Sequence, residues 1–212
     1  MTRTGRAISL GNRGRVDANI EVIGKASHSS SPEAGHSALD GANQVLNRLK
    51  AIPHADSHPL LGSRHTVPYQ LIFQPLAPHT LPEVARLRVD RRLLPGDDPD
   101  QAVDAIRQAI GDIAPYQISV ERGEYMLPAL CDPDHIGVRS LMRSHREMLG
   151  AEPSTFYGQG TFDAGGPCAA GIPAVMYGVG GGDWPLGEDF VPISHLTQVA
   201  QVMAHMVLGT LG

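Results

Sequence analysis

The strongest constraint on how this chain can fold is a period of two in two of its segments. In residues 15–24, apolar side chains alternate with polar ones: Val16, Ala18, Ile20 and Val22 against Asp17, Asn19 and Glu21. The alternation recurs in residues 83–91: Ala85, Leu87 and Val89 against Arg86, Arg88 and Asp90. A period of two is typical of a strand with one buried and one wet face. Two such strands predict an antiparallel sheet that buries only one face.

Further elements surround these two strands in an informative order. Apolar residues at helical spacing predict a helix after the first strand: Leu39, Ala42, Val45, Leu46 and Leu49. Three more elements are predicted: a strand over residues 66–74, a helix beginning at Asp98 and Pro99, and a strand around residues 118–121. The order strand, helix, strand, strand, helix, strand predicts a ferredoxin-like α+β sandwich over residues 14–122. We expect both helices on one face and the other face free to meet water or a partner.

Residues 123–212 follow a different pattern. Asp132 and Pro133 predict the start of one helix, and Ser194 predicts the cap of a final helix. Residues 173–178 are apolar without alternation, which predicts a strand buried on both faces, as in a parallel α/β sheet. One or two strands and two helices cannot close an α/β layer around a core. We therefore expect this segment to be part of an α/β domain that other strands complete.

Composition restricts the partners and the compartment. The net charge of -5 and the lack of a Lys/Arg cluster argue against a nucleic-acid-binding surface. The chain contains no run of about 18 apolar residues, so no membrane-spanning helix is predicted. The first ten residues lack the apolar core of a secretion signal. Cys131 and Cys168 fit neither a metal-site spacing nor a disulfide framework, so we expect a reducing, cytoplasmic environment.

Three segments, in order, carry a resemblance to a known family. The first, residues 14–39, has a strand, then Gly, a His, small residues, Pro, and Gly before a helix. The second, residues 79–98, has Pro, a strand, Asp-x-Arg and Pro-Gly. The third covers residues 158–182 and 188–196, with a Gly-Thr-x-Asp loop, Ala-Gly-Ile-Pro, a glycine-rich loop and a closing helix. Together they resemble the zinc peptidase family of acetylornithine deacetylase, succinyl-diaminopimelate desuccinylase, aminoacylase and carboxypeptidase G.

The resemblance implies a domain organisation and a cofactor. Residues 1–13 would leave the catalytic domain, residues 14–122 would be the lid and dimerisation domain, and residues 123–212 would be the C-terminal part of the catalytic domain. Family members form homodimers through the lid. They use two zinc ions to activate a water that attacks the carbonyl of a small N-acyl amino acid or peptide.

The resemblance assigns no metal ligand to this chain. The His-x-Asp motif, the bridging Asp and the Glu-Glu pair have no counterpart in it, so we expect an N-terminal half with the metal ligands to be absent from residues 1–212. The position of the last family ligand is occupied by Pro185, which cannot bind zinc, and Glu188 and Asp189 stand in reverse order. His195 lies too far along the chain to be its replacement.

Five residues inherit roles from the resemblance. His28 matches the lid histidine that stabilises an oxyanion in the partner's site; the alternative is a polar loop histidine. Arg92 matches the arginine that grips a substrate carboxylate; the alternative is a solvated charge at a strand end. His79 occupies an Asn position, and both side chains can donate a hydrogen bond; the alternative is a surface-loop histidine. Gly160 and Thr161 match the loop that meets the substrate carboxylate; the alternative is a tight turn, with Asp163 capping the following helix.

Three other motifs lack the spacing or the partner residues that phosphate binding, metal binding or nucleophilic catalysis would require. Gly180, Gly181 and Gly182 lack the spacing and the Lys-Ser/Thr of a P-loop. His54, His58 and His65 share a loop without metal-site geometry, and Ser29 to Ser31 have no positioned acid for a triad. Three hypotheses remain: a family fragment that is inactive alone, a non-catalytic dimerising or ligand-binding module, and one subunit of a split enzyme.

Overall fold

The computed structural model describes residues 5–53, 57–181 and 190–211. The chain divides into two compact units, residues 15–125 and residues 1–14 together with 126–212. In the described residues, no helix is both long enough and apolar enough to cross a membrane.

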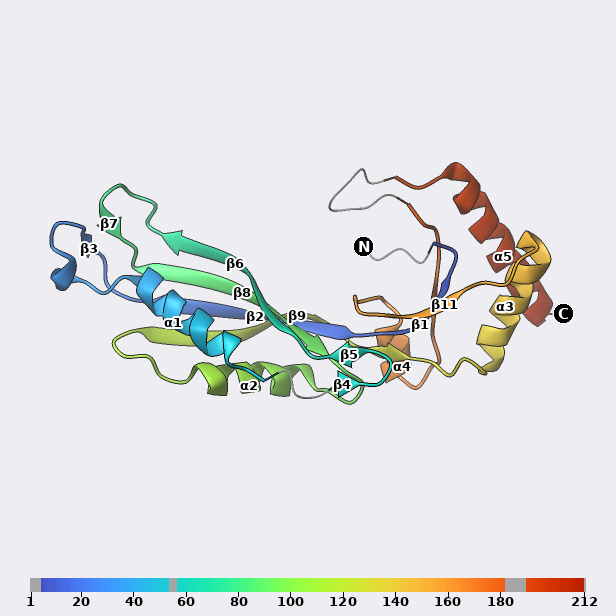
Figure 1. Cartoon of the computed structure of the whole chain (residues 1–212), viewed down its shortest axis with the longest axis horizontal. Helices are drawn as coiled ribbons and strands as arrows, with labels where there is room; N and C mark the ends of the chain where they lie inside the picture. The colour runs from blue at the N-terminus through green and yellow to red at the C-terminus, as the bar shows by residue number, and fades with distance from the viewer. Residues whose placement is uncertain (1–4, 54–56, 182–189, 212) are drawn as a thin grey trace. The chain divides into compact units, whose positions relative to one another are not determined.

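The unit of residues 15–125 is a four-stranded sheet with two helices (Figure 1). Its main elements are β2 (Gly14–Ile23), α1 (Ala38–Lys50), β6 (Thr66–Gln74), β8 (Val84–Leu93), α2 (Pro99–Ile110) and β9 (Gln117–Met126). The strand order is β6-β8-β2-β9, so the first strand of the unit lies between the third and the fourth. This is the order of a ferredoxin-like sandwich, and the fold class predicted from the alternation is confirmed.

One face of this sheet and the two helices form a single hydrophobic core. The inward side chains of β2 and β8 are almost fully buried: Val16, Ala18, Ile20, Val22, Ala85, Leu87 and Val89. Val45 of α1 and Ile106 of α2 pack against them. Burial of each Val, Leu or Ile stabilises the fold by about 1.5–3 kcal/mol. The core therefore fixes the sheet to the helices and leaves its other face open.

Helix starts in this unit follow the expected chemistry. The Asp98 side chain accepts a hydrogen bond from the Gln101 N–H at 2.9 Å, and Pro99 is the first residue of α2, as predicted. Ser37 caps α1 by accepting from the Leu39 N–H at 3.3 Å. Leu39 itself is 44% exposed, so it lies outside the apolar stripe in which it was placed.

The connections contain short pairings that periodicity did not predict. β3 (Ser27–His28) pairs antiparallel with β7 (Thr80–Leu81), and a 3-10 turn, η1 (Pro32–Ala34), follows β3. β4 (Ser57–His58) pairs with β5 (Gly62–Ser63) inside the segment predicted as a loop. Two-residue strands carry too few residues for a period of two to be visible.

The second unit is built around β1 (Ile8–Asn12), which sequence analysis did not predict as a strand. β1 pairs in parallel with β11 (Thr155–Gly158) and antiparallel with β10 (Ala129–Leu130) and β12 (Met176–Tyr177). The helices are α3 (Ile136–Leu149), α4 (Gly165–Ala169) and α5 (Ile193–Leu211). α3 and α5 pack on each other, and Ile8, Leu10, Val138, Leu141 and Val202 are buried in a second core.

The strand predicted at residues 173–178 is wrong in three respects. Only Met176 and Tyr177 form a strand, both are half-buried, and β12 runs antiparallel to β1. The parallel neighbour of β1 is β11 instead. An apolar run indicates that a segment is buried but does not indicate which strand it pairs with. The direction of β12 relative to its neighbour therefore could not be predicted from the sequence.

Two helix starts were also misplaced. α3 begins at Ile136, and its cap is His135, whose Nδ1 accepts from the Gly137 N–H at 3.2 Å. Asp132 instead accepts from the Asp134 N–H at 2.8 Å in the preceding turn. α5 begins at Ile193, so Ser194 lies inside the helix rather than at its cap.

A partly buried ion pair ties the β4–β5 segment to the turn before α2. The Asp97 carboxylate accepts hydrogen bonds from Arg64 Nε at 2.8 Å, from Arg64 Nη2 at 2.5 Å and from the Leu94 N–H at 2.8 Å. Burial alone would raise the pKa of Asp97. The hydrogen bonds from Arg64 and Leu94 and the charges of Arg64 and Arg91 outweigh burial, so the pKa lies below its ordinary value. Asp97 therefore stabilises the fold above the unfolded-state pKa of about 3.9, and this contribution is lost as pH falls through the lower folded-state pKa.

Asp97→Asn is expected to lower the free energy of unfolding by about 1–3 kcal/mol at pH 7, because it leaves the guanidinium of Arg64 partly buried without its carboxylate. The difference from wild type should shrink below about pH 4. Urea denaturation at pH 7 and pH 3 measures both. Asp104→Asn is the control, because its ion pair with Arg107 is about half exposed and is expected to contribute almost nothing. Equal losses for the two variants would contradict the assignment.

Candidate functional site

His28 is exposed and lies in the two-stranded antiparallel pairing of β3 with β7. Its register partner across the pair is Thr80. The Ser30 Oγ lies 2.8 Å from His28 Nδ1, and the Ser30 N–H donates to the same nitrogen at 3.2 Å. A backbone N–H can only donate, so Nδ1 accepts and, in the neutral ring, the proton is on Nε2. His28 Nε2 has no hydrogen-bond partner among the described residues, so the side chain presents an N–H donor to its surroundings.

His79 lies beside His28. The two ring centroids are 6.1 Å apart, and the Ser29 N–H donates to the His79 carbonyl at 2.8 Å. The backbone of His79 has φ 56°, in the left-handed region. Among residues other than glycine, this region is populated mainly by Asn, Asp and His. The position where the family has Asn thus requires a residue that tolerates this backbone, and histidine meets that requirement.

Arg92 lies near the C-terminal end of β8, whereas β7, which pairs with the strand of His28, precedes the start of β8. Its Nε is 3.0 Å from Asp90 Oδ1, and its backbone N–H donates to the His65 carbonyl at 2.9 Å. Eight residues separate it from Val84 at the start of the strand, which corresponds to roughly 26 Å. The structure therefore brings His28 and His79 together but keeps Arg92 apart from both within this unit.

Gly160 and Thr161 belong to the other unit, in the loop between β11 and α4. Both are half-buried. The strands β1 and β11 are parallel and end side by side, with Asn12 paired to Gly158. The loop thus leaves the carboxyl ends of parallel strands, which is where α/β sheets commonly bind ligands. Asp163 does not cap α4, because the cap position is Ala164 and has no side-chain hydrogen bond.

Two residues that sequence analysis missed support this loop. Arg13 is only 5% exposed; its Nε donates to the Gln159 carbonyl at 2.9 Å, and its backbone N–H donates to the Gly158 carbonyl at 3.3 Å. Asn12 is 1% exposed, and its Oδ1 accepts no hydrogen bond from the described part of the chain. The available signal was the Gly-Asn-Arg-Gly segment of residues 11–14, in which two polar side chains stand between glycines.

A second histidine cluster joins α3 to α5. His205 Nδ1 lies 3.1 Å from Ser144 Oγ, and its Nε2 lies 3.4 Å from Glu147 Oε2. The residue types match a Ser-His-acid triad, but Ser144 is only 2% exposed and cannot reach a substrate. The cluster is therefore a contact between two helices. Burial, with a smaller contribution from Arg6, lowers the pKa of the neighbouring His145, whose Nδ1 lies 2.9 Å from the Tyr177 hydroxyl.

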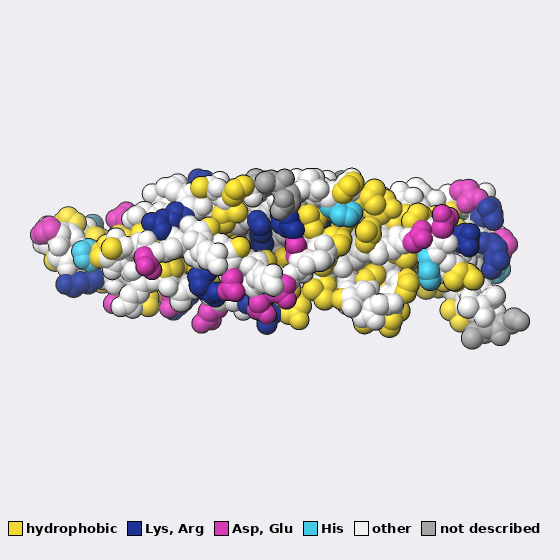
Figure 2. Space-filling model, turned by 90° about the horizontal axis from the view of Figure 1, so that it is seen from below, with side chains coloured by type: hydrophobic (Ala, Val, Ile, Leu, Met, Phe, Trp, Pro, Cys, Tyr) yellow, Lys and Arg dark blue, Asp and Glu magenta, His cyan; other side chains and the backbone are white. Residues whose placement is uncertain are grey.

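The described residues contain no group of three His, Cys, Asp or Glu side chains that could hold a metal ion. His58 accepts the Leu60 N–H at 3.2 Å through Nδ1. The sequence positions His54, Gly182, Pro185, Glu188 and Asp189 lie outside the described residues. On the face shown in Figure 2, Lys and Arg side chains lie in small groups, several of them next to acidic ones.

Comparison with known proteins identifies the family. Residues 10–117 match the family described as Peptidase dimerisation domain (M20). An acetylornithine deacetylase of Myxococcus xanthus is 26% identical over 210 residues, covering 92% of this chain and 53% of that protein.

Two solved structures share the fold. The aminopeptidase PepT from Bacillus cereus has a TM-score of 0.71 and 20% identity, covering 96% of this chain and 53% of PepT. The dipeptidase Dug1p from Saccharomyces cerevisiae has a TM-score of 0.75 and 12% identity, covering 98% of this chain and 56% of Dug1p. The chain spans about half the length of these relatives.

The resemblance drawn from the three sequence motifs is confirmed by these matches. The family match begins in β1 and extends through the ferredoxin-like sandwich as far as the first residue of its last strand, β9. The relatives with a stated activity include peptidases and a deacetylase, which are hydrolases. Because the matched region is half of the chain and lies on the fold that its sequence predicts, the chain belongs to the M20 peptidase family through its dimerisation domain.

Proposed function

We propose that residues 1–212 form the C-terminal part of a metal-dependent amidohydrolase that cleaves an N-acyl or peptide bond next to a free carboxylate. The observation that carries the proposal is the exposed N–H donor of His28, in a chain that belongs to a family of peptidases and deacylases. A donor at this place can stabilise negative charge that develops on a carbonyl oxygen. The acetylornithine deacetylase relative supports an N-acyl amino acid as one substrate class.

The other candidate residues have complementary roles in this proposal. Arg92 offers a planar guanidinium, which can bind a carboxylate through two parallel hydrogen bonds. Gly160 and Thr161 offer backbone N–H groups and a hydroxyl at the carboxyl ends of β1 and β11. His79 supports His28 through the Ser29 N–H that its carbonyl accepts. Arg13 positions the loop through its hydrogen bond to Gln159.

Zinc is the metal that the family resemblance implies, and the described residues of this chain do not fit a zinc site. We therefore propose that the zinc ligands are supplied from outside residues 1–212, and that these residues are inactive alone. Zinc would supply an activated water, as metal ions do in hydrolases. We also propose a cytoplasmic location, on the basis of the two free cysteines.

After dialysis, the purified chain is expected to hold much less than one zinc per chain and to release no amino acid from N-acetylated amino acids. Elemental analysis and an amine-release assay measure the two quantities. Addition of a zinc-binding segment that completes the α/β layer should restore both zinc binding and activity. Stoichiometric zinc in the chain alone would contradict the proposal.

Two alternative functions predict different outcomes, in the same assays or in co-purification. A non-catalytic module would dimerise or bind a ligand but gain no activity with any zinc-binding segment. A split enzyme would co-purify with a separate zinc-binding chain. The exposed apolar residues of α5 favour a partner over a stand-alone module: Leu196, Met203, Val207 and Leu208.

We propose that the chain forms a homodimer through the edge strand β6. Among the described strands, β6 pairs with β8 alone, and it exposes four apolar side chains: Val67, Tyr69, Leu71 and Ile72. The opposite edge, β9, carries Glu121, Arg122 and Glu124, and charged residues discourage edge pairing. A dimer would also serve catalysis, because a substrate of one or two residues spans only about 7 Å and cannot bridge His28 and Arg92 of one subunit.

The chain is expected to be a dimer at micromolar concentration, measured by light scattering. Leu71→Lys should shift it towards monomer, because a charge on an edge strand opposes pairing with a second edge. Ile136→Lys is the matched control, since Ile136 is also exposed but lies on α3 in the other unit. A monomeric wild type, or equal effects of both substitutions, would contradict the β6 interface.

In the assembled enzyme, His28→Ala is expected to lower kcat roughly 10²–10³-fold with little change in KM, because an oxyanion donor acts in the transition state. His58→Ala is the matched control: its Nδ1 also accepts a backbone N–H two residues on, but in the β4–β5 hairpin. Steady-state kinetics on one N-acetyl amino acid measure both. Unchanged kcat in His28→Ala would remove this residue from the mechanism.

A further inference from the structure

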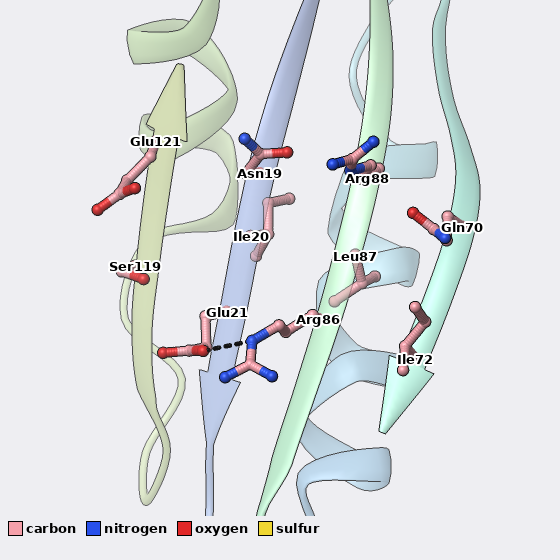
Figure 3. A pocket seen from close by; sticks show the side chains of 10 residues that line it. All are labelled: Asn19, Ile20, Glu21, Gln70, Ile72, Arg86, Leu87, Arg88, Ser119 and Glu121. Carbon is pink, nitrogen blue, oxygen red and sulfur yellow. Dashed lines mark hydrogen bonds and ion pairs between the residues drawn. The ribbon is translucent and has the colours of Figure 1, made fainter. Parts of the chain in front are cut away.

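The sheet face that the helices leave open is hollowed by a groove of about 470 Å³ across all four strands (Figure 3). This size falls within the range of small-molecule sites. The groove lies within the unit of residues 15–125 and contains none of the five residues assigned to the proposed catalytic function. An inference about it therefore does not depend on that function.

The polar side chains of the groove form two rows across the sheet (Figure 3). In one row the charges satisfy each other: Arg86 Nε lies 2.7 Å from Glu21 Oε1, and Arg86 Nη1 donates to Gln74 at 3.2 Å. The other row runs from Glu121 on β9 across Asn19 on β2 to Arg88 on β8. The two rows differ in how far their charges are already neutralised.

The charges of the second row are separated and unmatched. No carboxylate in the described part of the chain forms an ion pair with Arg88, which hydrogen-bonds the Tyr69 hydroxyl; that hydroxyl donates to Asp17 Oδ2 at 3.1 Å. Glu121 likewise has no ion-pair partner among the residues that the structure describes. β2 separates their strands, which places the strand axes roughly 10 Å apart. Arg88 and Glu121 thus line the same groove from strands on either side of β2, although the Glu121 carboxylate is turned outward past β9 in Figure 3 and must rotate inward to meet a ligand.

The charge balance decides between ligand classes. Arg86 and Arg88 are offset by Glu21 and Glu121, so the groove has no net charge to attract a simple anion or cation. We propose that the groove binds a short zwitterion, a free amino acid or dipeptide, with its carboxylate at Arg88 and its ammonium group at Glu121. Ser119 adds a hydroxyl beside the ammonium pole, and Gln70 adds an amide beside Arg88.

The length of such a ligand matches the spacing. The charged ends of an extended dipeptide are about 7 Å apart, and those of a single amino acid about 3 Å. An ion-pair contact of about 2.8 Å at each end extends these to roughly 12 and 9 Å, on either side of the strand spacing. Asn19 lies between the poles, where its side-chain amide can hydrogen-bond a peptide group.

The test is an NMR titration of the full chain with glycylglycine, N-acetylglycylglycine and glycylglycinamide. The last two each lack one charge of the zwitterion. Glycylglycine is expected to produce saturable amide shifts on β2, β8 and β9 with a millimolar Kd. The single-charge analogues should bind at least about tenfold more weakly, because each loses one charge-assisted contact. Tetraglycine, whose charged ends lie farther apart than those of a dipeptide, should also bind more weakly.

Charge-reversal variants distinguish the two poles from general surface charge. Arg88→Glu and Glu121→Arg should each abolish the shifts, whereas the double variant should regain them with the ligand reversed. Arg139→Glu is the matched control, because Arg139 is exposed on α3 in the other unit and has no ion pair among the described residues. Circular dichroism confirms that the variants remain folded, as expected for exposed positions.

Three results would overturn the proposal. One is equal affinity for glycylglycine and a single-charge analogue. Another is the lack of saturable shifts on these strands at about 10 mM ligand, a concentration about tenfold above a millimolar Kd. The third is loss of self-association in Arg88→Glu together with no ligand shifts in the wild type, because a second copy of the chain would then occupy the open face.

Discussion

The alternation of apolar and polar side chains along β2 and β8 is the constraint on which residues 15–125 depend. Every second residue of these strands is buried against α1 and α2, and a slip of one residue would turn charged side chains into that core. The register is therefore fixed by burial. The same alternation forces the polar residues onto the open face, so the core and the polar groove are two consequences of one pattern.

The second unit depends on close backbone contact around β1. A Cβ at Gly165 would lie 1.8 Å from the Leu127 carbonyl oxygen, and a Cβ at Gly14 would lie 2.5 Å from that of Met126. Only glycine permits such approach without displacing the backbone. These contacts hold the start of α4 and the start of β2 in place, and the Gly160–Thr161 loop lies between α4 and the end of β11. Arg13 then fastens this loop through Gln159.

The candidate site is distributed rather than concentrated. The β3–β7 pair that holds His28 and the residue Arg92 lie near opposite ends of β8, and the Gly160–Thr161 loop belongs to the other unit. The proposed function accounts for this distribution, because in it these residues act on a substrate together with groups from a second subunit and a zinc-binding segment. The geometry of His79 adds a physical account of one departure from the family pattern, since its left-handed backbone suits both Asn and His.

The sequence by itself determined the ferredoxin-like sandwich, the Asp98 cap and the family, because periodicity and capping are local and the family motifs are linear. It did not determine β1, β11, the direction of β12 or the start of α3. Short buried strands carry no visible period, and pairing depends on residues far apart in the chain. Only the tertiary structure decided which candidates meet. It brought His28 to His79, placed Arg13 and Asn12 beside the Gly160 loop, and set Arg88 and Glu121 across one open face, because such distances depend on strand order and packing, not on position along the chain.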